Sequence, residues 1–114
     1  MNEMPLIIPT LREISVVKKE DIVCFAFEEK GWRMYTVDGK NAFLSNRANK
    51  NFLLSLYDHL IVVNKSLIFN IDYISSIENN SFSCTLKTDV YSGDVKFSKR
   101  EYASFVRKSK VFEK

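Results

Sequence analysis

The sequence LIVVNKSLIFNIDYISSI, residues 60–77, is the stretch that decides the fold. Two apolar segments, Leu60–Val63 and Leu67–Phe69, flank the polar tripeptide Asn64-Lys65-Ser66. Short apolar runs of this kind are typical of buried β-strands, and a polar tripeptide between them is typical of a tight, exposed connection. The pattern therefore predicts two central strands joined by a turn that can present an amide and a cation to a partner.

Most of the remaining sequence is also strand-like. Short apolar or alternating runs recur along the chain, and Asp38-Gly39 between two of them is the strongest short-range hairpin signal. Further strands are expected at residues 6–8, 14–17, 22–27, 32–37, 42–44, 74–77, 81–88 and 90–97, the last with a bulge at Gly93. We therefore predict a mainly β fold of about ten short strands.

Two segments change to a helical period. Residues 46–58 carry one apolar stripe, and Asn46 or Asn49 can cap its start by accepting a backbone amide. Ser98 and Glu101 have the spacing of a capping box, which places a second helix at about residues 98–109. Three side chains on the apolar sides of their elements are expected to be buried, namely Phe52, Ile68 and Phe105.

Length and charge narrow the class of protein. The 114 residues suffice for one domain with one core, and the net charge of +3 permits a nucleic-acid partner without demanding one. The charge is uneven: residues 95–114 contain seven Lys or Arg and two Glu, so the rest of the chain is net negative. This basic C-terminal segment is either a solvated helix face or part of a binding surface.

Several functions lack the residues that they require. Cys24 and Cys84 form no C-x-x-C motif, and His59 has no neighbours at metal-ligand spacing. The sequence has no Gly-rich phosphate loop, no H-E-x-x-H motif and no apolar run near the roughly 20 residues that cross a bilayer. We expect a non-enzymatic, cytoplasmic protein with reduced cysteines, no cofactor, no metal and no membrane contact.

The central stretch resembles the signature of the LytTR-type DNA-binding domain of bacterial transcription regulators. The run from Val63 to Asn70, followed by Tyr73-Ile74, has the family's order of apolar strand, polar residues, Ser, aliphatics and Asn. Val62, Asn64 and Leu67 stand where the family usually has Arg, His and an aromatic residue. The later run Phe97-Ser98-Lys99-Arg100-Glu101-Tyr102 is also similar to the family pattern of Ser, basic residues and an aromatic residue.

The resemblance covers about residues 11–111 and implies that residues 1–114 form a single elongated, multi-sheet β domain. It further implies double-stranded DNA as the partner, with loops that enter successive major grooves of a repeat-containing promoter site. A second copy on a direct repeat and a receiver domain outside this chain are implied as well. The family's DNA-contacting positions correspond here to Trp32, Arg33, Asn64, Lys65, Lys99 and Arg100.

Five of these six residues also have an ordinary structural explanation. Trp32 can be a rim aromatic over the hairpin, and Asn64 can be a turn residue that bonds its own backbone. Arg33, Lys65 and Arg100 can be solvated surface cations. The alternative function is therefore a non-catalytic protein-interaction domain that keeps the LytTR fold and has lost base recognition. Val62 and Asn64, which stand in place of the usual Arg and His of the signature, favour that alternative.

Overall fold

The computed structural model describes residues 4–109, so both ends of the predicted domain lie outside the described residues. Within that range the chain is mainly β, with nine strands and two α-helices. The strands are β1 (Leu6–Pro9), β2 (Ile14–Val17), β3 (Ile22–Glu28), β4 (Gly31–Thr36), β5 (Asn41–Phe43), β6 (Leu60–Asn64), β7 (Leu67–Asn70), β8 (Ile74–Ile77) and β9 (Cys84–Leu86). The helices are α1 (Lys50–Leu54) and α2 (Lys99–Lys108).

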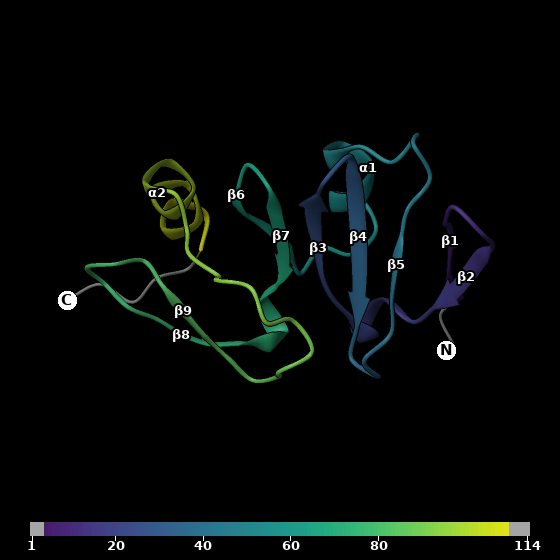
Figure 1. Ribbon diagram of the computed structural model, residues 1–114. Helices are drawn as coiled ribbons and strands as arrows, with labels where there is room; N and C mark the ends of the chain where they lie inside the picture. Colours follow the sequence, from purple (N-terminus) through teal and green to yellow (C-terminus); the bar gives the residue numbers. More distant parts are fainter. Residues whose placement is uncertain (1–3, 110–114) are drawn as a thin grey trace.

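The strands form three antiparallel sheets that lie side by side (Figure 1). The central sheet has the order β5-β4-β3-β7-β6, and the β1–β2 and β8–β9 pairs flank it at the two ends of the molecule. The principal extents of 48, 39 and 25 Å make the domain elongated, as predicted. The two strands of the deciding stretch, β6 and β7, pair with each other, and β7 also pairs with β3.

The core has one apolar cluster on each face of the central sheet. Phe25 and Ile68 are paired across β3 and β7, and they pack with Leu53 of α1 in the first cluster. Phe69 packs with Phe97 in the second cluster, on the side of α2 and β8–β9. Because β3 and β7 have a neighbour on both edges and a cluster on each face, their apolar runs are nearly continuous rather than alternating.

The Asp38-Gly39 hairpin is confirmed. Gly39 has a φ of +88°, a conformation that a residue with a Cβ rarely adopts. The Asp38 carboxylate accepts hydrogen bonds from the Thr36 hydroxyl at 2.6 Å and from the Lys40 amide at 3.0 Å. These bonds lower the pKa of Asp38 and fix the turn that joins β4 to β5.

The first helix is shorter than predicted. Asn49 is the cap, with its side-chain oxygen 2.9 Å from the Phe52 amide, and α1 ends after five residues. A helix of little more than one turn can bury only one side. It buries Leu53 completely, whereas Phe52 is 38% exposed, so the predicted burial of Phe52 is wrong. Ile68 is fully buried as predicted, and Phe105 is only partly buried.

The predicted strand at residues 90–97 is not formed. The segment is irregular and makes one isolated bridge, between Ser83 and Lys96. Val95 and Phe97 are buried, which explains the apolar alternation, but the neighbouring strand β9 is only three residues long. Gly93 marks no bulge. A Cβ at this position would come within 2.5 Å of the Tyr91 hydroxyl, so the close approach of that ring explains the glycine.

Candidate nucleic-acid interface

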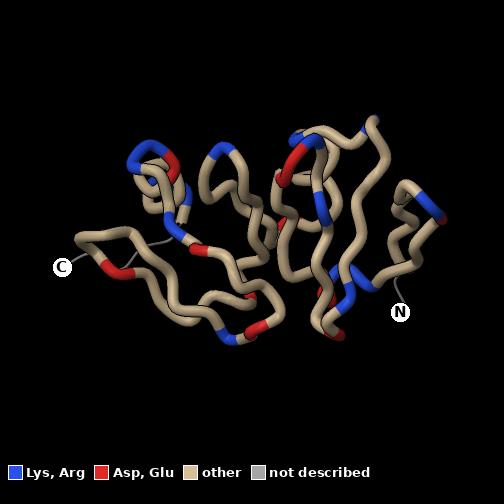
Figure 2. The backbone as a smooth tube through the Cα atoms, in the orientation of Figure 1, with Lys and Arg blue, Asp and Glu red and all other residues tan. Residues whose placement is uncertain are grey.

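Several Lys and Arg positions of the backbone lie along one long edge of the molecule (Figure 2). The β3–β4 turn, the β6–β7 turn, the β5–α1 loop and the start of α2 all lie on this edge. We call it the basic edge, and its cations are Lys30, Arg47, Lys50, Lys65, Lys99 and Arg100. Within residues 4–109 none of these six takes part in an ion pair.

Two of the predicted DNA-contacting places are held together by hydrogen bonds. The Ser98 amide donates to the Val63 carbonyl at 2.9 Å, which docks the start of α2 on the end of β6. The Asn64 side chain donates to the Lys96 carbonyl at 3.0 Å and accepts from the Ser66 amide at 2.9 Å. Lys65 is therefore exposed on a fixed turn next to the start of α2.

The start of α2 has the predicted cap. The Ser98 hydroxyl accepts from the Glu101 amide at 3.2 Å, and the Ser98 amide is occupied by Val63 rather than by the Glu101 side chain. Lys99 and Arg100 in the first turn are exposed. The positive end of a helix dipole disfavours cations and favours anions. Two exposed, unpaired cations at this position are explained best by an anionic ligand that they meet.

The third predicted place has a different geometry. Trp32 is 8% exposed and packs edge to face on Phe27, with ring centroids 5.2 Å apart, so its side chain offers little surface to a ligand, and its DNA contact stays a prediction. The reason is the alternation of β4, which turns Trp32 and Met34 toward the α1 cluster. The sequence could not decide which face of this strand is covered.

Arg33 lies on the other face of β4 and is constrained. Its Nη1 atom is 3.4 Å from the Glu28 carboxylate, and its guanidinium stacks over the Phe43 ring at 4.3 Å from the ring centroid. Glu28 also accepts a hydrogen bond of 2.6 Å from Tyr35, and burial together with this bond raises the pKa of Tyr35. Arg33 is thus partly neutralised, and it is less available to a ligand than the cations of the basic edge.

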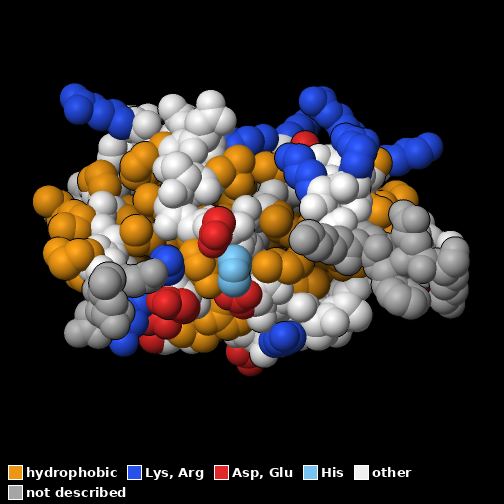
Figure 3. Space-filling view, turned by 180° about the vertical axis from the view of Figure 1, so that it is seen from behind, with side chains coloured by type: hydrophobic (Ala, Val, Ile, Leu, Met, Phe, Trp, Pro, Cys, Tyr) orange, Lys and Arg blue, Asp and Glu red, His pale blue; other side chains and the backbone are white. Residues whose placement is uncertain are grey.

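The reverse side of the molecule carries a separate polar cluster (Figure 3). His59 lies 2.8 Å from Asp72 through Nδ1 and stacks on Tyr57, which donates a 3.0 Å hydrogen bond to the same carboxylate. The His59 carbonyl also accepts from the Ile71 amide at 2.9 Å. This cluster ties the chain after α1 to the turn after β7, and Figure 3 shows it below the cationic rim.

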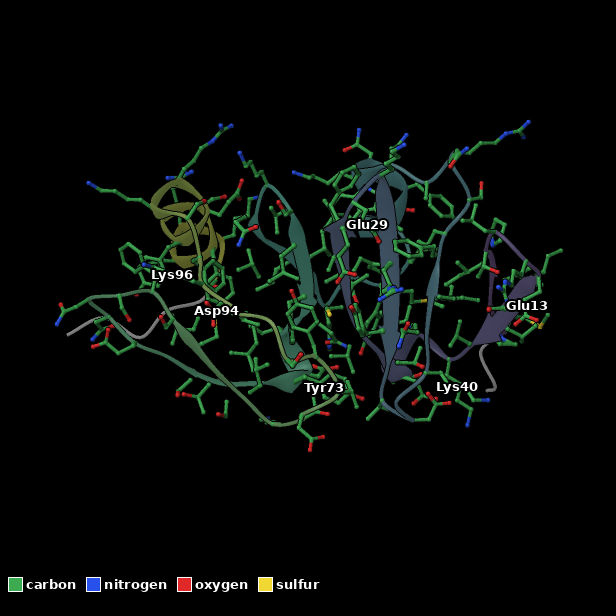
Figure 4. All side chains as sticks on the ribbon, viewed as in Figure 1. Glu13, Glu29, Lys40, Tyr73, Asp94 and Lys96 are labelled. Carbon is green, nitrogen blue, oxygen red and sulfur yellow. The ribbon has the colours of Figure 1, made fainter. Side chains whose placement is uncertain are left out.

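The opposite edge has a mixed charge. The β4–β5 turn with Lys40 and the turn at Tyr73 lie there, well away from the basic edge (Figure 4). Asp38 and Asp72 on this side are engaged in the bonds described above. The basic edge brings together cations from several separate segments, an arrangement that the linear sequence does not reveal for Lys30, Arg47 and Lys50. No local motif marks those three residues.

The comparisons agree with this geometry. A family model described as the LytTr DNA-binding domain matches residues 12–110. A solved structure from Bacillus cereus, described as the "LytTr DNA-binding domain of putative methyl-accepting/DNA response regulator", has the same fold with a TM-score of 0.66 and 16% identity. That match covers 93% of this chain and 96% of the other. A search of curated proteins gave no match.

No helix within residues 4–109 is long and apolar enough to cross a membrane. The mainly β architecture, the basic edge and the family match over residues 12–110 lead to one conclusion. This chain belongs to the LytTr DNA-binding domain family.

Proposed function

We propose that the domain binds double-stranded DNA sequence-specifically through its basic edge, as the output part of a transcription regulator. The observation that carries the proposal is the alignment, along one edge of a LytTr domain, of cations that are mostly exposed and have no ion pair within residues 4–109. Phosphates require such cations, and they account for the salt dependence of DNA binding. Base discrimination requires in addition a side chain with directed donors.

The proposed roles follow from exposure and side-chain chemistry. Arg100 is exposed in the first turn of α2 and can donate two hydrogen bonds to guanine O6 and N7 in a major groove. Lys65 and Lys99 are point charges suited to phosphates. Asn64 keeps the two sites in register through its bonds to Lys96 and Ser66. Arg33, held by Glu28, is a secondary contact.

A comparison of Arg100→Ala with Lys65→Ala tests the proposal. Binding of each variant is measured by fluorescence anisotropy on a duplex selected from a random pool with the wild-type domain, and on a scrambled duplex, between about 50 and 200 mM salt. Arg100→Ala should lose about 1–3 kcal/mol on the selected duplex and much less on the scrambled one. Lys65→Ala should weaken both alike and reduce the salt slope by about one.

Lys40→Ala is the matched control, because Lys40 is an exposed lysine on the opposite edge. It should leave both affinities unchanged. A wild-type domain that binds no duplex at low salt would reject the DNA-binding proposal. It would leave the alternative, a protein-interaction domain that keeps the fold without base recognition.

A further inference from the structure

The β5–α1 loop, residues 44–49, projects from the basic edge near the β1–β2 pair, on the side of the central sheet away from α2 (Figure 1). Both of its stems are fixed. Leu44 is buried and its amide donates to the Trp32 carbonyl at 2.8 Å, while the Ser45 amide donates to the Pro9 carbonyl at 3.1 Å. At the other stem Asn49 caps α1. The loop therefore projects from the surface on two stems that are held by hydrogen bonds and by packing.

Its tip consists of Asn46 and Arg47, and both side chains are exposed. Either Asn46 or Asn49 could have capped the helix, and the structure uses Asn49, so the Asn46 side chain does not cap α1. Within residues 4–109 neither tip side chain has a hydrogen bond or an ion pair. The Arg47 backbone amide donates to the Ser45 hydroxyl at 3.1 Å, which shapes the tip.

An apolar hollow of about 360 Å³ lies beside this tip. Its lining includes Arg47, Ala48 and the half-exposed ring of Phe52. An Asn, an Arg and an apolar surface are the groups that recognise adenine, guanine and the thymine methyl in a major groove. The exposed ring of Phe52, on the side of α1 that the core does not cover, is part of this apolar surface.

We propose that the Asn46-Arg47 tip is a further base-reading element of the DNA interface, with Asn46 directed to adenine and Arg47 to guanine. This inference rests on the proposed function, because the tip and the start of α2 share the basic edge. The tip and the start of α2 lie apart on this edge, on either side of the β3–β4 and β6–β7 turns. They can thus meet separate bases of one duplex.

The test uses the duplex selected with the wild-type domain and single base-pair substitutions across it. Arg47→Ala should lower affinity for the intact duplex by about tenfold and for a scrambled duplex by much less. The Arg47→Ala variant should also bind equally well to duplexes that are substituted at one or two base pairs which the wild-type domain discriminates. Those positions should be distinct from the positions to which Arg100→Ala becomes indifferent. Asn46→Ala should relax a neighbouring A·T position.

Thermal melts confirm that each variant is folded, and Lys40→Ala again serves as the control. If Arg47→Ala and Asn46→Ala keep the wild-type preference at every base pair, the tip does not read DNA. Equal losses on selected and scrambled duplexes would equally overturn the inference, because they would make Arg47 a phosphate contact. Either result, together with a loss of discrimination for Arg100→Ala, refutes this inference alone and leaves the proposed function intact.

Discussion

Tyr91 packs edge to face on Tyr35 at 5.1 Å and on Phe69 at 6.1 Å. Burial, with smaller effects of Cys24 and Glu28, raises the pKa of Tyr91 to about 12 from its ordinary value of 10.0. The folded state therefore favours the neutral phenol. This contribution to stability is complete below pH 10 and is lost as the pH rises toward 12.

Tyr91→Phe removes the ionising group and keeps the ring. We expect its free energy of unfolding at pH 8 to lie within about 0.5 kcal/mol of the wild-type value. Between pH 10 and 12 it should lose less stability than the wild type. Urea melts at a series of pH values provide the measurement. Parallel losses of stability in the two proteins would contradict the assignment of this titration to Tyr91.

The apolar residues Ile68 and Phe52 form a second comparison at this scale. Ile68 is fully buried between the sheet and α1, whereas Phe52 is 38% exposed. Ile68→Ala should cost about 2–5 kcal/mol of unfolding free energy, because it leaves a cavity in the core. Phe52→Ala should cost less than half of that. A larger loss of unfolding free energy for Phe52→Ala than for Ile68→Ala in urea melts would contradict the burial described for these two side chains.

At the scale of elements, the corner between β6, β7 and α2 depends on Asn64. Asn64→Ala removes the acceptor of the Ser66 amide and the donor to the Lys96 carbonyl. The loss should be about 1–3 kcal/mol, because polar backbone groups are left without partners. In hydrogen exchange the Ser66 amide should exchange faster, while Asn46→Ala should have no such effect. Unchanged protection of Ser66 would contradict the bonding described here.

The elements with strong local signals were the predictable ones. The apolar runs of β3, β6 and β7, the Asp38-Gly39 turn and the Ser98 cap were all identified from sequence, because each depends on neighbouring residues. The length of α1 and the conformation of residues 90–97 depend on what packs against them. Periodicity alone therefore predicts a helix that is too long and a strand that is not formed.

The candidate site likewise has residues whose placement the local sequence indicates and residues whose placement depends on packing. Lys65, Lys99 and Arg100 lie exposed on the basic edge, in places that the turn and the cap indicate locally. The burial of Trp32 depends on the cluster beneath β4. The partner of Asn64 is a backbone carbonyl 32 residues away, and backbone carbonyls leave no trace in a sequence pattern. Neither the burial of Trp32 nor the hydrogen-bond partner of Asn64 can be predicted without knowledge of the fold.

At the scale of the whole molecule, we propose that two copies of the domain occupy a direct repeat on one face of the duplex, with half-sites spaced near a multiple of 10–10.5 base pairs. Inserting about five base pairs between the half-sites places the copies on opposite faces, so joint binding should weaken. Gel-shift titrations of paired sites measure this. Affinity that does not depend on the insertion would exclude cooperative same-face binding.

The most direct test of the central claim, that the basic edge is the DNA interface, is amide chemical-shift mapping of the domain with the selected duplex. Perturbations should concentrate on the β3–β4 turn, the β6–β7 turn, the β5–α1 loop and the first turn of α2. The turns at Lys40 and Tyr73 on the opposite edge should be unaffected. Perturbations centred on that opposite edge, or on the β1–β2 hairpin, would contradict the account.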